Sequence, residues 1–107
     1  GRLEEAVQAY EAFETHAPTD YLRQAAINSR AHALERAERV GEALQAYGQA
    51  ADIDGPYRQA ALRSQARLAE LSGQKEQARA ALERLLELYP GSSDTESLAG
   101  RLAELSQ

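Results

Sequence analysis

Nine polar residues, in three sets with the spacing i, i+4, i+7, are the side chains best suited to recognise a partner. This spacing places the three members of each set on one face of a helix. Arginine guanidiniums there can donate paired hydrogen bonds to carboxylates, and Asn and His can bond to backbone or side-chain groups of a bound segment. The sets are Asn28, His32 and Glu35; Arg63, Arg67 and Glu70; and Ser97, Arg101 and Glu104. Together they predict a polar column that binds an extended, acidic segment.

The same residues have a second interpretation. Arg67 with Glu70 and Arg101 with Glu104 are also i, i+3 pairs, each worth about 0.2–0.5 kcal/mol on a helix surface. For any single residue this interpretation is favoured, because exposed charge is usually solvated surface. The recurrence of the whole set favours binding, and both interpretations stay open.

No pattern typical of catalysis, of a cofactor site or of a metal site is present. The chain has no Cys, and its two histidines, His16 and His32, fall in different segments without ligand spacing. Its serines have no nucleophile-elbow context, and its glycines are dispersed instead of forming a phosphate-binding loop. We therefore predict no enzymatic activity, no cofactor and no metal ion.

The composition predicts an all-α protein that does not bind nucleic acid. Of the 107 residues, 43% are hydrophobic and 27% are charged, the formal net charge is −5, and only three residues are Pro. An acidic chain without a basic run argues against a phosphate-binding surface. No apolar stretch is long enough for a membrane span, and the absence of Cys fits periplasm and cytoplasm equally.

The chain is a tandem repeat. The hexapeptide RLAELS at residues 67–72 recurs 34 residues later at 101–106, and RQAA at 23–26 recurs 35 residues later at 58–61. One repeat unit cannot bury its apolar face alone, so neighbouring units stack and share a core. Stacked units leave extended surfaces, which makes binding a better prediction than chemistry.

Apolar columns divide each repeat into a first and a second helix. The second helices align by three apolar columns and a terminating column: Ala6, Ala43 and Ala78; Tyr10, Tyr47 and Leu82; Phe13, Ala50 and Leu85; and Pro18, Gly55 and Pro90. The first helices contain a small-residue column, Ala31, Ala66 and Gly100, that should let a neighbouring helix approach closely. Helices are predicted at 2–16, 20–37, 40–53, 56–72, 74–89 and 93–106.

Turn and capping residues agree with these boundaries. Thr19 can cap the helix that follows it, Pro56 suits a first helical turn, and Gly73 suits a C-terminal turn. Ser93 and Glu96 have the spacing of a capping box.

The second-helix pattern resembles that of the tetratricopeptide repeat. It is formed by Gly73, Ala78, Leu82, Leu85 and Pro90, and again by Gly1, Ala6, Tyr10, Phe13 and Pro18. The resemblance implies a solenoid of about six antiparallel helices, roughly three repeats, with first helices on a concave face. It departs from the family pattern where Glu38 replaces the usual Gly, Gly55 the usual Pro, Arg30 and Gln65 the usual Leu, and Glu96 a large apolar residue.

The same resemblance implies a partner-binding role for the concave face. The partner would be a protein or an extended peptide, and the residues would be Asn28, His32, Glu35, Arg63, Arg67, Glu70 and Arg101. Family members that grip chaperone C-termini use Lys and Asn at fixed groove positions. Asn28 and Arg63 stand at one Lys position, and His32 and Arg67 at one Asn position. We therefore do not expect chaperone-tail recognition.

We expect the chain to be a tetratricopeptide segment excised from something longer. We expect 1–18 to be the second helix of a truncated repeat, 19–55 and 56–91 to be repeats, and 92–107 to be a further first helix or a cap. The Ala/Arg-rich repeats and acidity resemble the periplasmic tetratricopeptide region of bacterial exopolysaccharide-export proteins of the Pel type. That resemblance implies docking of a polysaccharide-modifying enzyme in the periplasm, with the cytoplasm as the alternative location. The alternative function is a self-association or spacer module whose open ends stack on another copy.

Overall fold

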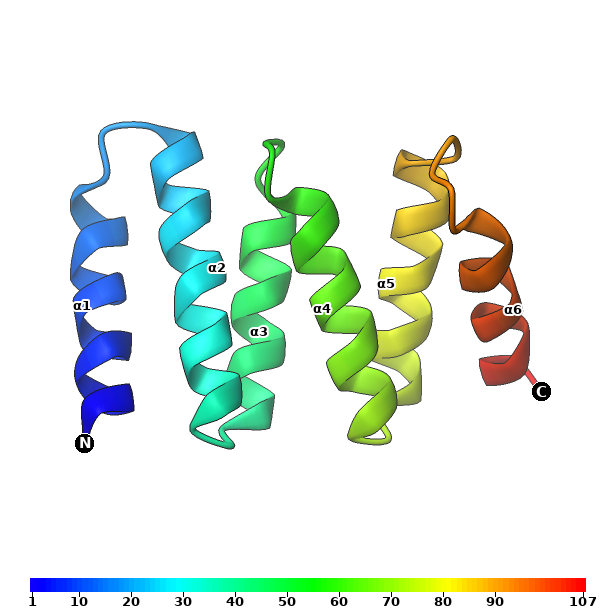
Figure 1. Ribbon diagram of the computed structural model, residues 1–107, viewed down its shortest axis with the longest axis horizontal. Coiled ribbons are helices and arrows are strands. Elements are labelled where there is room, and N and C mark those ends of the chain that lie inside the picture. Colours follow the sequence, from blue (N-terminus) through cyan, green and yellow to red (C-terminus); the bar gives the residue numbers. More distant parts are fainter. The chain divides into compact units, whose positions relative to one another are not determined.

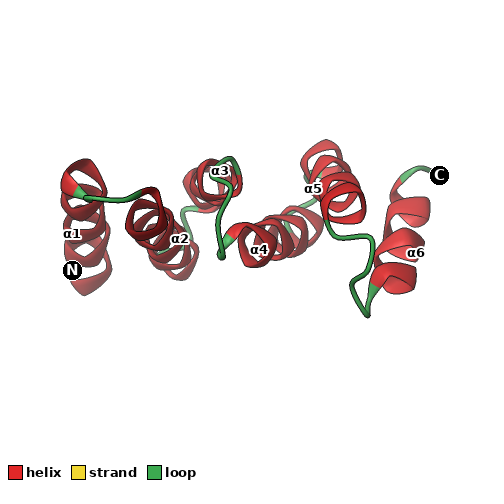
Figure 2. Cartoon of the chain, turned by 90° about the horizontal axis from the view of Figure 1, so that it is seen from above, coloured by secondary structure: helices red, strands yellow, loops and turns green.

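The computed structural model describes residues 1–107 as six α-helices without strands (Figure 1). The all-α helical repeat fold is confirmed, and each predicted helix is present with its ends displaced by at most two residues. Short loops join the helices, as Figure 2 shows. The helices are α1 (Arg2–His16), α2 (Asp20–Arg36), α3 (Val40–Ala51), α4 (Arg58–Leu71), α5 (Lys75–Leu88) and α6 (Thr95–Leu105).

The chain divides into two compact units, residues 1–61 and residues 62–107. In the first unit, α2 packs against both α1 and α3. In the second unit, α5 packs against α6, and the part of α4 that belongs to this unit lies beside α5 in both views (Figures 1 and 2).

Two of the predicted helix-end residues have the expected roles. The Thr19 hydroxyl oxygen accepts a hydrogen bond from the Leu22 amide at 3.2 Å, which satisfies a free N–H in the first turn of α2. Gly73 has a φ of 76°, the left-handed conformation that closes a helix. At the same place in the preceding repeat, Glu38 adopts a φ of 61°, although its side chain makes this conformation costly.

The other two predictions of helix ends are wrong. Pro56 lies in the turn before α4, which begins at Arg58. No capping box forms at α6, because the residue before it is Asp94 and makes no capping hydrogen bond. The Thr95 hydroxyl instead donates to the Ser92 carbonyl at 2.7 Å, so a local turn orders this helix start.

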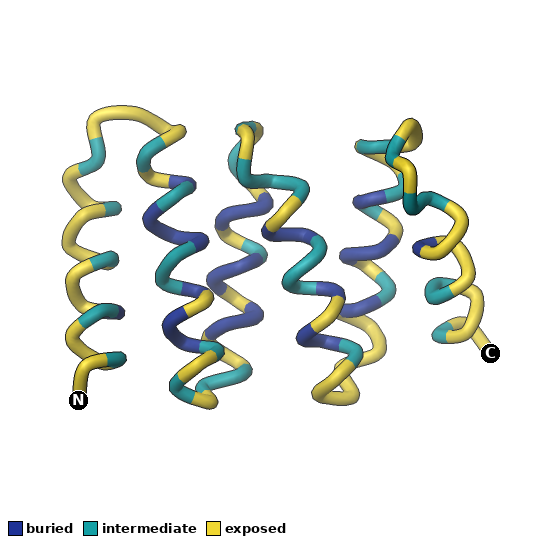
Figure 3. Tube along the Cα trace, in the orientation of Figure 1, coloured by how far each residue is buried: buried dark blue, intermediate teal, exposed yellow.

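The core consists of small alanines around a few large side chains. Buried residues concentrate on α2 to α5, whereas α1 and α6 are mostly exposed (Figure 3). Tyr47, Ala31 and Ala66 are fully buried, as their columns predict. Phe13 is 50% exposed, and a Cβ added at Gly100 would meet nothing within 4 Å. The predicted burial of Phe13 and the close helix approach at Gly100 are therefore wrong for residues 1–107.

A buried glutamine connects α2 to the end of α3 and the start of α4. Gln24 is 0% exposed, and its Nε2 donates to the carbonyls of Ala50 at 3.0 Å and Ile53 at 2.6 Å. Its Oε1 accepts from the Tyr57 amide at 3.0 Å. A Cβ at Gly55 would lie 2.5 Å from this Oε1. A side chain at position 55 would therefore collide with the buried glutamine amide.

Candidate partner-binding surface

The Tyr47 hydroxyl positions two of the three predicted binding residues on α2. It donates to Glu35 Oε1 at 2.7 Å and lies 2.8 Å from His32 Nδ1. Because a phenol has one proton, this arrangement requires His32 Nδ1–H to donate to the tyrosine oxygen. The His32 and Tyr47 rings also meet edge to face, with centroids 5.2 Å apart. The core thus fixes the orientation of both polar side chains.

The third predicted residue on α2 is not presented at the surface. Asn28 is 9% exposed, and its Oδ1 is buried without a hydrogen-bond partner. A buried acceptor without a donor is destabilising. A partner reaches this amide only if neighbouring side chains move.

In the second unit, Arg63 of α4 binds the residues that begin α6. Its Nη2 donates to Asp94 Oδ1 at 2.9 Å and to Ser92 Oγ at 3.0 Å, and its Nη1 donates to Asp94 Oδ2. Ser92 Oγ in turn donates to Asp94 Oδ1 at 2.6 Å. Hydrogen bonds from Arg63, and then from Ser92, hold the pKa of the Asp94 carboxyl well below its usual range. Sequence reasoning missed Asp94 and Ser92, because their pairing depends on how α4 and α6 meet.

Arg101 of α6 also pairs with the preceding first helix. Its Nε donates to Glu70 Oε1 at 3.1 Å, and its Nη2 donates to the same oxygen. The considered i, i+3 pair with Glu104 is therefore replaced by a contact between two helices. Arg67 is exposed at the surface of α4 between these two contacts.

These pairs determine what the second unit can do chemically. The charges of Arg63 and Arg101 are already compensated by Asp94 and Glu70. The side chains of both ion pairs are about a third exposed, so water and salt can reach them. A carboxylate of a partner would compete with Asp94 or Glu70 for a guanidinium. The binding role of the seven residues stays a prediction.

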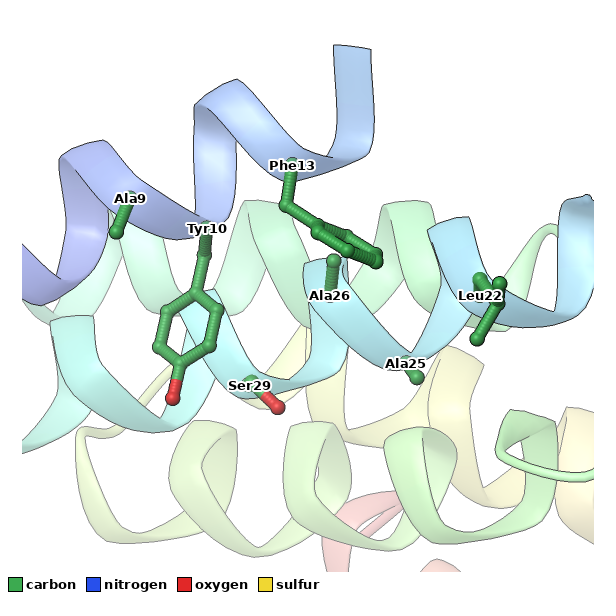
Figure 4. Close-up of a pocket in the computed structure, with 7 residues that line it drawn as sticks. All are labelled: Ala9, Tyr10, Phe13, Leu22, Ala25, Ala26 and Ser29. Atoms are coloured by element: carbon green, nitrogen blue, oxygen red, sulfur yellow. The ribbon is translucent and has the colours of Figure 1, made fainter. Parts of the chain in front are cut away.

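An open apolar groove lies between α1 and α2 and was not predicted. It has a volume of about 420 Å³, and Tyr10 and Phe13 extend from α1 toward α2 at its wall (Figure 4). Its lining residues are Ala9, Tyr10, Phe13, Leu22, Ala25, Ala26 and Ser29. The sequence signal was present in the apolar columns of residues 6–13, but we interpreted those columns as core.

Residues 1–107 contain neither a metal-binding cluster nor a membrane-spanning helix. No group of three or more His, Cys, Asp or Glu side chains is arranged to hold a metal ion. None of the six helices combines the length and the apolarity that a membrane crossing requires.

Comparison with known proteins identifies one segment. No curated protein and no solved structure matches the chain. Residues 57–92 match the family model described as Tetratricopeptide repeat, and this range includes α4 and α5. Repeats of this family generally mediate protein–protein interaction and are typically non-catalytic. The segment that contains α4 and α5 is therefore similar to a tetratricopeptide repeat, within an all-α helical repeat fold.

Proposed function

We propose that residues 1–107 act as a non-catalytic scaffold that binds a protein partner or an extended peptide through the first helices of its repeats. The similarity of residues 57–92 to the tetratricopeptide repeat carries this proposal, because such repeats generally mediate protein–protein interaction. The repeat architecture supports it as well, since repeated helix pairs leave extended surfaces for partners.

Each unit would contribute its own set of contacts. In the first unit, His32 and Glu35 are held by Tyr47, so little side-chain entropy would be lost on binding. In the second unit, Arg63, Arg67 and Arg101 would bind acidic side chains of the partner. When a carboxylate of the partner displaces Asp94 or Glu70 from its guanidinium, one ion pair is replaced by a similar one. We therefore expect a transient interaction with modest electrostatic gain.

The test is capture followed by a binding measurement. Immobilised residues 1–107 are exposed to extract from the source organism, retained proteins are identified by mass spectrometry, and one is purified for calorimetric titration. Arg67→Glu is expected to weaken that partner's binding about fivefold or more, since it reverses an exposed charge. Arg63→Glu with Arg67→Glu is expected to abolish capture.

The control is Arg2→Glu with Lys75→Glu, which makes the same change of net charge at exposed positions of the second helices α1 and α5. Capture by this control together with loss in the Arg63→Glu/Arg67→Glu variant supports the first-helix surface. Because Arg63→Glu also breaks the pair with Asp94, circular dichroism must show unchanged helix content. Equal partner affinity in all variants would rule out this surface.

A finer form of the proposal names the partner as a polysaccharide-modifying enzyme of a bacterial exopolysaccharide-secretion machinery in the periplasm. It rests on the Ala/Arg-rich, degenerate repeats and the acidity of the chain. Identification of such an enzyme in the capture experiment would support it. A cytoplasmic partner would contradict it and leave the scaffold role standing.

A further inference from the structure

The rings of Tyr21 and Tyr57 are in contact within the first unit. Tyr21 lies in the first turn of α2, and Tyr57 lies in the turn before α4. Their ring centroids are 5.8 Å apart, and the ring planes are inclined at 45°. A hydrogen bond to Tyr21 raises the pKa of the Tyr57 hydroxyl, so this phenol keeps its proton at neutral pH. The two side chains therefore meet at their hydroxyl ends.

The helix that carries Tyr21 also holds the backbone of Tyr57. Gln24 follows Tyr21 by three residues on α2, and its Oε1 accepts a hydrogen bond from the Tyr57 amide at 3.0 Å. Because Gln24 is fully buried, this connection is shielded from water. The rings themselves are accessible, since Tyr21 is 51% exposed and Tyr57 is half-buried. The pair is thus fixed in position and open to reagents in the solvent.

The composition of the chain directs oxidation to its tyrosines. The 107 residues contain no Cys and no Met, whose sulfur atoms oxidise readily, and no Trp. Of the five tyrosines, Tyr47 is fully buried. Tyr10 and Tyr89 are half-buried and have no tyrosine ring beside them in residues 1–107. Tyr21 and Tyr57 are therefore the two accessible phenols that lie in contact with each other.

We propose that Tyr21 and Tyr57 are an oxidative modification site, at which a haem peroxidase with hydrogen peroxide joins the two rings as dityrosine. The peroxidase takes one electron and one proton from each phenol and leaves two phenoxyl radicals. The radicals couple through a new carbon–carbon bond between the ring carbons next to the hydroxyl-bearing carbons. Each coupled carbon then loses its hydrogen as a proton, and each phenol oxygen regains one. The chain loses two hydrogen atoms, and hydrogen peroxide takes them up to give two water molecules.

The geometry favours coupling within one chain over coupling between chains. Groups that are held in contact react at a high effective concentration, so the two rings couple before another chain arrives in dilute solution. The carbons that couple lie beside the hydroxyl-bearing carbons, at the ends where Tyr21 and Tyr57 meet. The new bond would fasten the start of α2 to the turn before α4. This proposal does not depend on the scaffold function, which uses other residues of the first helices.

The test is oxidation of purified residues 1–107 in dilute solution with a haem peroxidase and hydrogen peroxide. The expected product is a monomer that has lost two hydrogen atoms and shows the blue fluorescence of dityrosine. Mass spectrometry after proteolysis should find two peptides joined at Tyr21 and Tyr57. Tyr21→Phe and Tyr57→Phe should each lower the yield of cross-linked monomer at least about tenfold, because Phe keeps the ring but leaves the other phenol without a partner in contact.

Tyr10→Phe and Tyr89→Phe are the matched controls, because each removes a half-buried phenol that has no tyrosine ring beside it. Both should give as much cross-linked monomer as the unmodified chain. Circular dichroism verifies that all four variants keep their helices. Three results would overturn the proposal: an oxidised monomer without a cross-link, cross-linked dimers in place of the cross-linked monomer, or a yield that Tyr57→Phe leaves unchanged.

Discussion

The loop after α3 and the loop after α5 occupy the same place in two successive repeats, but they are stabilised by different chemistry. After α3, the neutral and fully buried Gln24 makes three hydrogen bonds to backbone groups of Ala50, Ile53 and Tyr57. The glutamine at the same position of the next repeat, Gln59, is half-buried and makes no side-chain hydrogen bond. In the loop after α5, Asp94 and Ser92 are bound by Arg63, which is about a third exposed.

The two repeats differ in sequence at the loop position that the Gln24 amide approaches in the first unit. Gly55 leaves the space that the Gln24 amide fills, whereas Pro90 stands at the equivalent position of the next repeat. A proline has a Cβ and a ring, which would occupy the position of that amide. Identical RQAA segments at 23–26 and 58–61 are thus followed by loops that differ at this repeat position.

The largest effect in this comparison is expected from Gln24→Ala. The substitution removes all three hydrogen bonds, although the Ala50 carbonyl keeps the bond that it accepts from the Ile53 amide at 3.3 Å. We expect the free energy of unfolding to fall by about 3 kcal/mol. Gln59→Ala is the matched control and should change it by less than about 0.5 kcal/mol. Urea denaturation followed by circular dichroism measures both. Equal losses would show that the two loops do not differ in this way.

A smaller loss is expected from Gly55→Ala. The new Cβ would push against the Gln24 amide, and we expect a cost of about 2 kcal/mol in unfolding free energy. Gly91→Ala is the control, since a Cβ there meets nothing within 4 Å. In a Gln24→Ala background, Gly55→Ala should lose most of its cost. A cost that persists there would exclude the steric cause.

Substitutions in the two turns between first and second helices, at Glu38 and at Gly73, should change the stability of the chain in opposite directions. Glu38 and Gly73 both have left-handed φ values, which glycine adopts without strain. Glu38→Gly should therefore stabilise the chain by about 0.5 kcal/mol, and Gly73→Ala should destabilise it by about 1 kcal/mol. Thermal unfolding of both variants beside the unmodified chain measures these changes. Destabilisation by Glu38→Gly would mean that the Glu38 side chain contributes contacts that outweigh the strain.

The smallest expected effect is a loss of stability at acidic pH. The pKa of Asp94 is lowered in the folded state, so its contribution to stability is present above the unfolded-state pKa of about 3.9 and is lost as the pH falls below it. The Gln24 contacts contain no titrating group. The protection factor of the Leu98 amide in α6, which corrects for the pH dependence of the intrinsic exchange rate, should therefore fall on acidification before that of the Tyr57 amide. Asp94→Asn should abolish this difference, and its persistence would assign the acid sensitivity to another carboxyl.

The sequence predicted the helices well because their signals are local. The apolar residues at helical spacing act within a few residues, as do the capping residue Thr19 and the turn residue Gly73. The observed helices follow these signals. The errors arose where distant residues decide. The burial of Phe13 depends on a neighbouring helix, and the partners of Arg63, Arg101 and Gln24 lie about 30 residues away, so the choice among several carboxylates or carbonyls requires the packed helices.

The hydrogen bonds of Tyr47 have an optical consequence. The chain has five tyrosines and no Trp, so its ultraviolet fluorescence comes from tyrosine alone. Tyr47 is the one fully buried tyrosine, and its hydroxyl is shared between His32 and Glu35 on the first helix α2. A carboxylate that accepts a phenolic proton quenches tyrosine emission. A ligand that moves Glu35 away from Tyr47 should therefore increase the tyrosine fluorescence of the chain. Binding at the predicted surface could then be followed without an added label.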